Sequence, residues 1–178
     1  LASGFIFPIV FLSFWFYLDN KIHVRDDLKS IGAPIVAEIP FARDLKEINH
    51  LSKIKSSLRI PLIESIRMLI ANINQTFPDK MNNSKKILIT SSIKGEGKTL
   101  VSVLTSKLVS LRNKKVLLIG ADLRNPQIHK YLNLDKSDNK GLSDYIYSDD
   151  ISFEKLIVKN DSLDVLLSGA IPSNPSEL

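Results

Sequence analysis

Residues 87–99 read ILITSSIKGEGKT, and this stretch decides the fold that the sequence predicts. Its first four residues form an apolar run typical of a buried strand, and apolar residues at helical spacing begin directly after Thr99. A glycine-rich loop between a strand and a helix is the setting of a phosphate-binding P-loop, because backbone amides and a helix N-terminus both favour an anion. We therefore expect residues 92–99 to bind the phosphates of a nucleotide.

The residue types in this loop suit ATP and Mg²⁺. The glycines let the backbone approach the phosphates, Lys98 supplies a mobile charge for the β and γ oxygens, and the Thr99 hydroxyl coordinates the metal. Ser92 stands where the pattern G-x-x-x-x-G-K-[ST] begins with glycine, so the loop is a variant. A turn that binds nothing is the alternative. The residues expected to bind the cofactor are Ser92, Lys94, Gly95, Glu96, Gly97, Lys98, Thr99 and Leu100.

Strand and helix patterns continue on both sides of the loop. The apolar spacing predicts helices over residues 62–77 and 100–111, strands over 87–90, 116–119 and 163–167, and a short helix that Ser143 caps. Strand, helix and strand in this order imply a right-handed parallel crossover. The expected fold class is therefore α/β, a doubly wound parallel sheet of the P-loop NTPase type.

An acidic residue follows the second predicted strand of the loop's crossover. Asp122 comes three residues after Ile119, at the carboxyl end of that strand, where α/β sheets bind their ligands. We expect its carboxylate to hold the metal or a metal-bound water. Its alternative role is to cap a helix or a turn, and the neighbouring P-loop favours the metal.

An uncharged apolar run, residues 1–18, opens the sequence. As a helix it would be about 27 Å long, close to the thickness of the bilayer hydrocarbon. Lys21, His23, Arg25 and Lys29 follow it, so the positive-inside rule places the rest of the chain in the cytoplasm. A signal-peptide core and a buried helix are the alternatives. Residues 19–60 are mixed in charge and predict a linker, with one short apolar stretch at 35–39 that allows a small strand.

The composition indicates a folded protein, with 44% hydrophobic and 24% charged residues among 178. The net charge is +5, and the basic residues are interleaved with acidic ones rather than gathered in a block. Nucleic acid is therefore not the expected partner. Cysteine is absent, which excludes disulfides and thiolate metal sites. The first residue is not methionine and residues 174–177, just before the last residue, begin a helix pattern, so we expect a piece of a longer protein.

These motifs together resemble those of the bacterial protein-tyrosine kinases (BY-kinases). Ser92-x4-Gly97-Lys98-Thr99 and then Ala121-Asp122-Leu123-Arg124-x-Pro126 are similar to the family's Walker A and Walker A′ motifs. The resemblance extends to GLSD at 141–144, LDVLLSG at 163–169 and PSNPSEL at 172–178. Glu64-x-x-Arg67 is similar to the first half of the family's E-x-x-R-x-x-R oligomerisation helix. Residues 1–18 resemble the second transmembrane helix of the attached polysaccharide co-polymerase module.

The resemblance implies that residues 61–178 are the N-terminal part of a cytoplasmic kinase domain on a bacterial inner-membrane protein. Such proteins govern the length and export of capsular or extracellular polysaccharide, together with the polymerisation and export machinery. The family's domain passes the γ-phosphate of MgATP to C-terminal tyrosines of a neighbouring subunit while a ring of subunits assembles and disassembles. By this resemblance Lys98, Asp122 and Arg124 are catalytic, Thr99 and Asp122 hold Mg²⁺, and Glu64 and Arg67 form the oligomer contact.

Two positions depart from the family pattern. Gly120 stands where the A′ motif has its first acid, and Ile70 stands where the oligomerisation motif has its second arginine. Three functions therefore stay open at this point. The first is an autophosphorylating tyrosine kinase, the second is a co-polymerase scaffold that binds MgATP without transferring phosphate, and the third is a partitioning-type P-loop ATPase.

Overall fold

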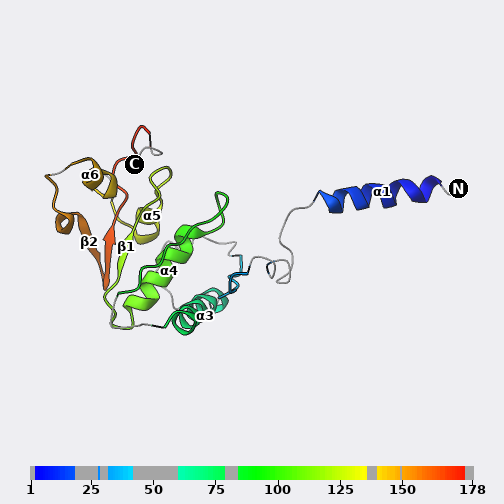
Figure 1. Cartoon of the computed structure of the whole chain (residues 1–178). Coiled ribbons are helices and arrows are strands. Elements are labelled where there is room, and N and C mark those ends of the chain that lie inside the picture. The colour runs from blue at the N-terminus through cyan, green and yellow to red at the C-terminus, as the bar shows by residue number, and fades with distance from the viewer. Residues whose placement is uncertain are drawn as a thin grey trace. The chain divides into compact units, whose positions relative to one another are not determined.

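The computed structural model describes residues 3–18, 28, 32–41, 60–78, 84–135, 140–148 and 150–174. The chain divides into two compact units, Leu1–Ile35 and Val36–Leu178. Figure 1 shows the second unit with its helices gathered around a small sheet. Most of the predicted linker lies outside the described residues, and so does the expected helix start at 174–177 except for its first residue, Asn174.

The first unit contains helix α1, Ser3–Tyr17, which is 15 residues long and includes Pro8. Its described side chains, from Phe7 onward, are all exposed. None of the helices in the described part of the chain is both long and apolar enough to cross a membrane. The structure therefore does not confirm the crossing expected over residues 1–18.

The second unit contains the remaining described elements, and these confirm an α/β fold. In chain order they are α3 (Ile60–Thr76), α4 (Lys98–Ser110), β1 (Leu117–Ile119), α5 (Ile128–Leu132), α6 (Leu142–Tyr147), the 3₁₀ helix η4 (Phe153–Leu156), β2 (Ile157–Asn160) and β3 (Leu163–Leu166). The predictions for 62–77, 100–111, 116–119 and 163–167 match α3, α4, β1 and β3. The helices α5 and η4 and the strand β2 were not predicted.

The sheet has the order β1-β3-β2. Strands β1 and β3 are parallel, with Leu118 opposite Val165, as the predicted crossover requires. Strand β2 is antiparallel to β3, so the prediction of a wholly parallel sheet is wrong at this edge. The cause is local, because only two residues, 161–162, join the paired Asn160 and Leu163, and so short a connection can form only a hairpin.

The core lies between the sheet and the two long helices. Val103 on α4 and Val165 on β3 are fully buried, and α4 contacts β1, β3, α3 and α5. The apolar face of α3 packs on α4, with Ile66 fully buried. Because α4 covers β1 and β3, it fixes the loop that precedes it relative to the sheet.

The predicted strand 87–90 does not form among the described residues. This stretch belongs to no sheet, and the Leu88 side chain is 85% exposed. A strand needs a hydrogen-bonded neighbour, and none of the described strands pairs with these residues. An apolar run alone therefore does not determine the conformation here.

The apolar stretch in the predicted linker belongs to the second unit from Val36 on. Residues 35–39 form no strand, but the side chains of Val36, Ala37 and Ile39 pack against the hydrophobic core. The side-chain amide of Asn72 on α3 donates a hydrogen bond to the Val36 carbonyl oxygen at 2.6 Å. This part of the linker is therefore attached to α3.

The predicted cap of the short helix is also corrected. Helix α6 begins at Leu142 and its N-cap residue is Gly141, so Ser143 lies inside the helix. The side chain that stabilises this helix start is that of Asp144, whose Oδ2 accepts a hydrogen bond from the Gly141 amide at 2.8 Å.

Candidate functional site

The candidate site begins in the loop before α4. Gly97 is the N-cap residue of this helix with φ 89°, and Gly95 has φ 96°. A side chain at either position would meet no atom within 4 Å, so crowding does not exclude one. The left-handed backbone is what requires glycine at both positions, because other residues pay a steric cost there.

This loop presents a row of backbone donors. Among the described residues, no protein acceptor takes the amide hydrogens of residues 94–100. Only the amide before them, that of Ile93, reaches a side chain, Glu96 Oε2, at 3.4 Å. Unpaired amides at a helix N-terminus, together with the helix dipole, make a cradle for an anion. The residues present therefore fit a phosphate group.

The first turn of α4 holds the side chains expected at the phosphates and the metal. Lys98 and Thr99 are half-buried there, and Leu100 is buried in the core. Leu100 can therefore reach a phosphate only through its backbone amide, while its side chain anchors the loop to the sheet. Mg²⁺ usually binds to one or two protein oxygens plus phosphate and water, which suits the Thr99 hydroxyl.

Asp122 follows β1 and is exposed. Its Oδ1 accepts a hydrogen bond from the Asn125 amide at 2.9 Å, so the carboxylate holds a turn. Its Oδ2 has no protein partner in the described part of the chain and can still bind a cation or a water. Arg124, in the same turn, is also exposed.

The loop and the turn lie at the same end of the sheet. Helix α4 runs back along β1, so its N-terminus lies toward the carboxyl end of that strand (Figure 1). Within the described residues, no hydrogen bond or ion pair joins Lys98 or Thr99 to Asp122. The structure thus places Lys98, Thr99 and Asp122 toward one end of the sheet, without a hydrogen bond or ion pair between them in the described part of the chain.

Gly120, at the end of β1, is buried. Its amide donates to the Leu166 carbonyl oxygen at 2.8 Å. A Cβ atom here would lie 3.2 Å from the Ser168 nitrogen and 3.3 Å from Ile128 Cδ1, which is tighter than most real contacts. At the position where the family pattern has an acid, the space next to the backbone is therefore occupied by Ser168 and Ile128.

The predicted oligomer contact lies on α3. Arg67 Nη1 and Glu64 Oε1 are 2.6 Å apart, one turn from each other, and each side chain is 52% exposed. Ile70, where the family pattern has its second arginine, is only 6% exposed and belongs to the core. The exposed pair is available to a partner, and the third position is not.

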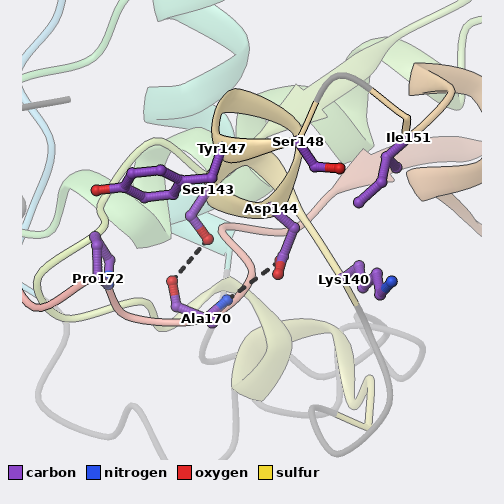
Figure 2. A pocket seen from close by; sticks show the side chains of 8 residues that line it. All are labelled: Lys140, Ser143, Asp144, Tyr147, Ser148, Ile151, Ala170 and Pro172. Atoms are coloured by element: carbon purple, nitrogen blue, oxygen red, sulfur yellow. Dashed lines mark hydrogen bonds between the residues drawn. The ribbon is translucent and has the colours of Figure 1, made fainter.

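The side-chain contacts between α6 and residue 170 were not predicted from the sequence. The carboxylate of Asp144 accepts from the amides of Gly141 and Ala170, and the Ser143 hydroxyl donates to the Ala170 carbonyl oxygen at 2.7 Å. Figure 2 shows these two side chains facing the backbone of residue 170, beside an open pocket of about 280 Å³. An acid three residues after a glycine was the available signal, since this is the spacing of a capping interaction.

Comparisons with known proteins identify relatives. Tyrosine-protein kinase YwqD of Bacillus subtilis (strain 168) is 35% identical over 116 residues, which are 65% of this chain and 47% of that protein. Tyrosine-protein kinase etk of Escherichia coli (strain K12) is 32% identical over 181 residues, 90% of this chain and 24% of that protein. The chain thus spans 24% to 47% of the length of these curated relatives. No family model matches it.

The likeness extends to three dimensions. The solved kinase domain of Escherichia coli tyrosine kinase ETK superposes with a TM-score of 0.71 at 26% identity, over 88% of this chain and 64% of that one. Three observations indicate the same family: the α/β fold, the position of the glycine loop before α4, and these sequence relatives. The chain therefore belongs to the family of bacterial protein-tyrosine kinases, the BY-kinases.

Proposed function

We propose that this chain is the nucleotide-binding part of an autophosphorylating protein-tyrosine kinase that regulates the length and export of capsular or extracellular polysaccharide. The observation that carries the proposal is the run of amides at residues 94–100, directly before and within the first turn of α4, which have no protein acceptor among the residues that the structure describes. The family membership supports phosphate transfer to tyrosine rather than to another acceptor.

The roles of the residues follow from their places. The amides of the loop would bind the β and γ phosphates, and the Lys98 ammonium group would close over them. The Thr99 hydroxyl would hold Mg²⁺, which when bound neutralises charge on the phosphates. The Asp122 Oδ2 would orient a metal-bound water or the acceptor hydroxyl, because Oδ1 is already engaged with the Asn125 amide. Arg124 would stabilise charge that develops on the transferred group.

The test is phosphate transfer by the complete protein. Labelled ATP with Mg²⁺ is expected to yield phosphotyrosine, and Lys98→Met is expected to abolish the signal without unfolding the protein. Lys94→Met is the matched control, because Lys94 is an exposed lysine of the same loop whose proposed contribution is its backbone amide. Absence of phosphotyrosine in the wild type, with nucleotide bound, would refute the kinase.

A second function is favoured by one observation, the packing of Gly120 against Ser168 and Ile128. Because residue 120 is glycine, one metal-side carboxylate of the family pattern is missing, and the packing leaves little room for a side chain there. A scaffold that binds MgATP to stabilise an assembly, without transferring phosphate, would need no second acid. Tight MgATP binding with no transfer is the result that selects this function.

The partners and the location are proposed on the same basis. The exposed pair of Glu64 and Arg67 supports contact with another copy of the chain, in a ring whose subunits phosphorylate one another. The polysaccharide polymerisation and export machinery would be the second partner. We place the protein at the bacterial inner membrane with its kinase domain in the cytoplasm, since apolar exposed α1 precedes a basic segment. Fractionation of cells that express the complete protein tests this location.

A further inference from the structure

We propose that Ser143 and Asp144 are positioning residues for Asp122. They fix the segment 168–170, against which the end of β1 packs, and so keep Asp122 where it serves the metal. This inference rests on the proposed function, since it assigns these two residues to the same nucleotide site. It assigns them no contact with the nucleotide.

Residues 168–170 are attached to α6 by backbone and side-chain hydrogen bonds. The amides of Leu142 and Ser143 donate to the carbonyl oxygens of Leu167 and Ser168 at 2.8 and 3.0 Å. The Ser143 hydroxyl donates to the Ala170 carbonyl oxygen at 2.7 Å, and Asp144 Oδ2 accepts a long hydrogen bond of 3.4 Å from the Ala170 amide. Figure 2 shows both side-chain bonds converging on residue 170.

The two attached segments approach each other so closely that only glycine fits at Gly141 and Gly169. A Cβ atom on Gly141 would fall within 3.0 Å of the Leu167 oxygen and the Gly169 nitrogen, distances that real Cβ atoms do not adopt. A Cβ atom on Gly169 would meet both the Ser143 hydroxyl and the Asp144 carboxylate. Two glycines thus let the segments approach closely enough for these side chains to bond the backbone, and Ser143 is 2% exposed.

The same segment lies against the end of β1, the strand that Asp122 follows. The Gly120 amide donates to Leu166 at 2.8 Å, and a Cβ atom at Gly120 would be 3.2 Å from the Ser168 nitrogen. Residue 168 is therefore a support for the end of β1, and Asp122 is two residues further on. Parallel strands end here, at the edge of an α/β sheet that binds ligands. A shift of residues 168–170 would pass directly to the turn that carries Asp122.

The experiment uses the complete protein and measures ATP affinity by calorimetry with and without Mg²⁺. Asp144→Ala is expected to reduce the gain in affinity that Mg²⁺ provides by about tenfold, the usual effect of removing a residue that orients a metal ligand. Metal-free ATP affinity is expected to stay unchanged, because the loop before α4 makes no contact with α6 among the described hydrogen bonds. Ser143→Ala should act in the same direction more weakly, and Asp144→Asn, which keeps an oxygen acceptor, should restore most of the effect.

A matched control and a direct readout keep the outcome clear. Asp164→Ala removes a half-buried carboxylate from the other end of the same β3 segment, where it pairs with Lys159, and should leave the Mg²⁺ effect as in the wild type. Amide hydrogen exchange should become faster at Gly120 in Asp144→Ala, not only at Gly141 and Ala170, which lose their bonds directly.

The opposing outcomes are distinct. An unchanged Mg²⁺ effect in Asp144→Ala overturns the inference, and so does an equal loss of affinity with and without Mg²⁺, which is the result of a merely structural role. A wild-type protein that binds MgATP but transfers no phosphate refutes the kinase alone, and the inference is still decided by the binding data. A wild-type protein that binds no nucleotide overturns both.

Discussion

The side-chain amide of Asn72 on α3 donates a hydrogen bond to the backbone carbonyl oxygen of Val36, 36 residues earlier in the chain, at 2.6 Å. Together with the packing of Val36, Ala37 and Ile39 on the core, this bond attaches the segment before the kinase fold to the helix that carries Glu64 and Arg67. A change in that segment can therefore reach the proposed oligomer contact through α3.

Replacing Asn72 by alanine tests this attachment. The variant loses one side-chain hydrogen bond at an exposed site, so we expect the free energy of unfolding to fall by about 1 kcal/mol. Denaturant unfolding measures the difference. Gln75→Ala, an exposed amide one turn further along the same helix, is the matched control and should change stability much less. Equal effects of the two substitutions would show that the bond to Val36 contributes nothing.

Alanine at three glycines tests the packing around α6 and the end of β1. Gly141→Ala places a Cβ atom among backbone atoms of residues 167–169 that cannot move aside, so we expect it to prevent stable folding or to cost about 3 kcal/mol or more. Gly120→Ala needs a shift of only a few tenths of an ångström and should cost about 1 kcal/mol. Gly95→Ala meets no neighbouring atom, so only the strain of the left-handed backbone should lower its stability.

Thermal and denaturant unfolding of the three variants provide the ranking. A Gly120→Ala protein less stable than Gly141→Ala would contradict the tighter packing around Gly141. The same series bears on the missing acid, because Gly120→Asp must fit the same space with a larger, charged side chain. We expect Gly120→Asp to be less stable than Gly120→Ala, so any gain in phosphate transfer must be measured per folded molecule.

Lys98 and Lys94 separate side-chain binding from backbone binding in the loop. Lys98→Ala removes a charge that we expect to bond the phosphates directly, so MgATP affinity should fall by about tenfold to a hundredfold, as for a charged hydrogen bond. Lys94→Ala keeps its amide and should change the affinity little. Both are partly or wholly exposed, so stability should change by less than about 0.5 kcal/mol. Calorimetry checks the affinities, and equal losses in the two variants would exclude the assigned roles.

The sequence predicted the elements whose apolar periodicity follows directly from having one face against the core. Helices α3 and α4 and strands β1 and β3 carry apolar residues that face one core, so periodicity was sufficient to locate them. The need for glycine at positions 95 and 97 was also predictable, since the loop requires a left-handed backbone at both. These features depend on contacts that are local or that any apolar partner satisfies.

Features that depend on one particular distant partner were not predicted. Residues 87–90 have the pattern of a strand, but a strand forms only where a neighbouring strand pairs with it. The residues of the run alone do not show whether such a neighbour exists. Residues 36–39 read as a linker because their anchor, Asn72, lies far along the chain. The role of Asp144 depends on the backbone of residue 170, which only the folded structure brings to it.

The last prediction concerns the Glu64–Arg67 pair, whose function can be separated from its contribution to stability. An exposed ion pair at this spacing stabilises a helix by less than about 0.5 kcal/mol. In the double variant Glu64→Arg, Arg67→Glu the pair persists within the helix, but the charges presented to a neighbouring subunit are reversed. We expect unfolding to be nearly unchanged while self-assembly of the complete protein, followed by sedimentation velocity, is lost. Assembly equal to that of the wild type would mean that these side chains face no neighbour. Loss of both assembly and stability would assign the pair to the fold, because a contact between subunits does not determine the unfolding of a dissociated monomer.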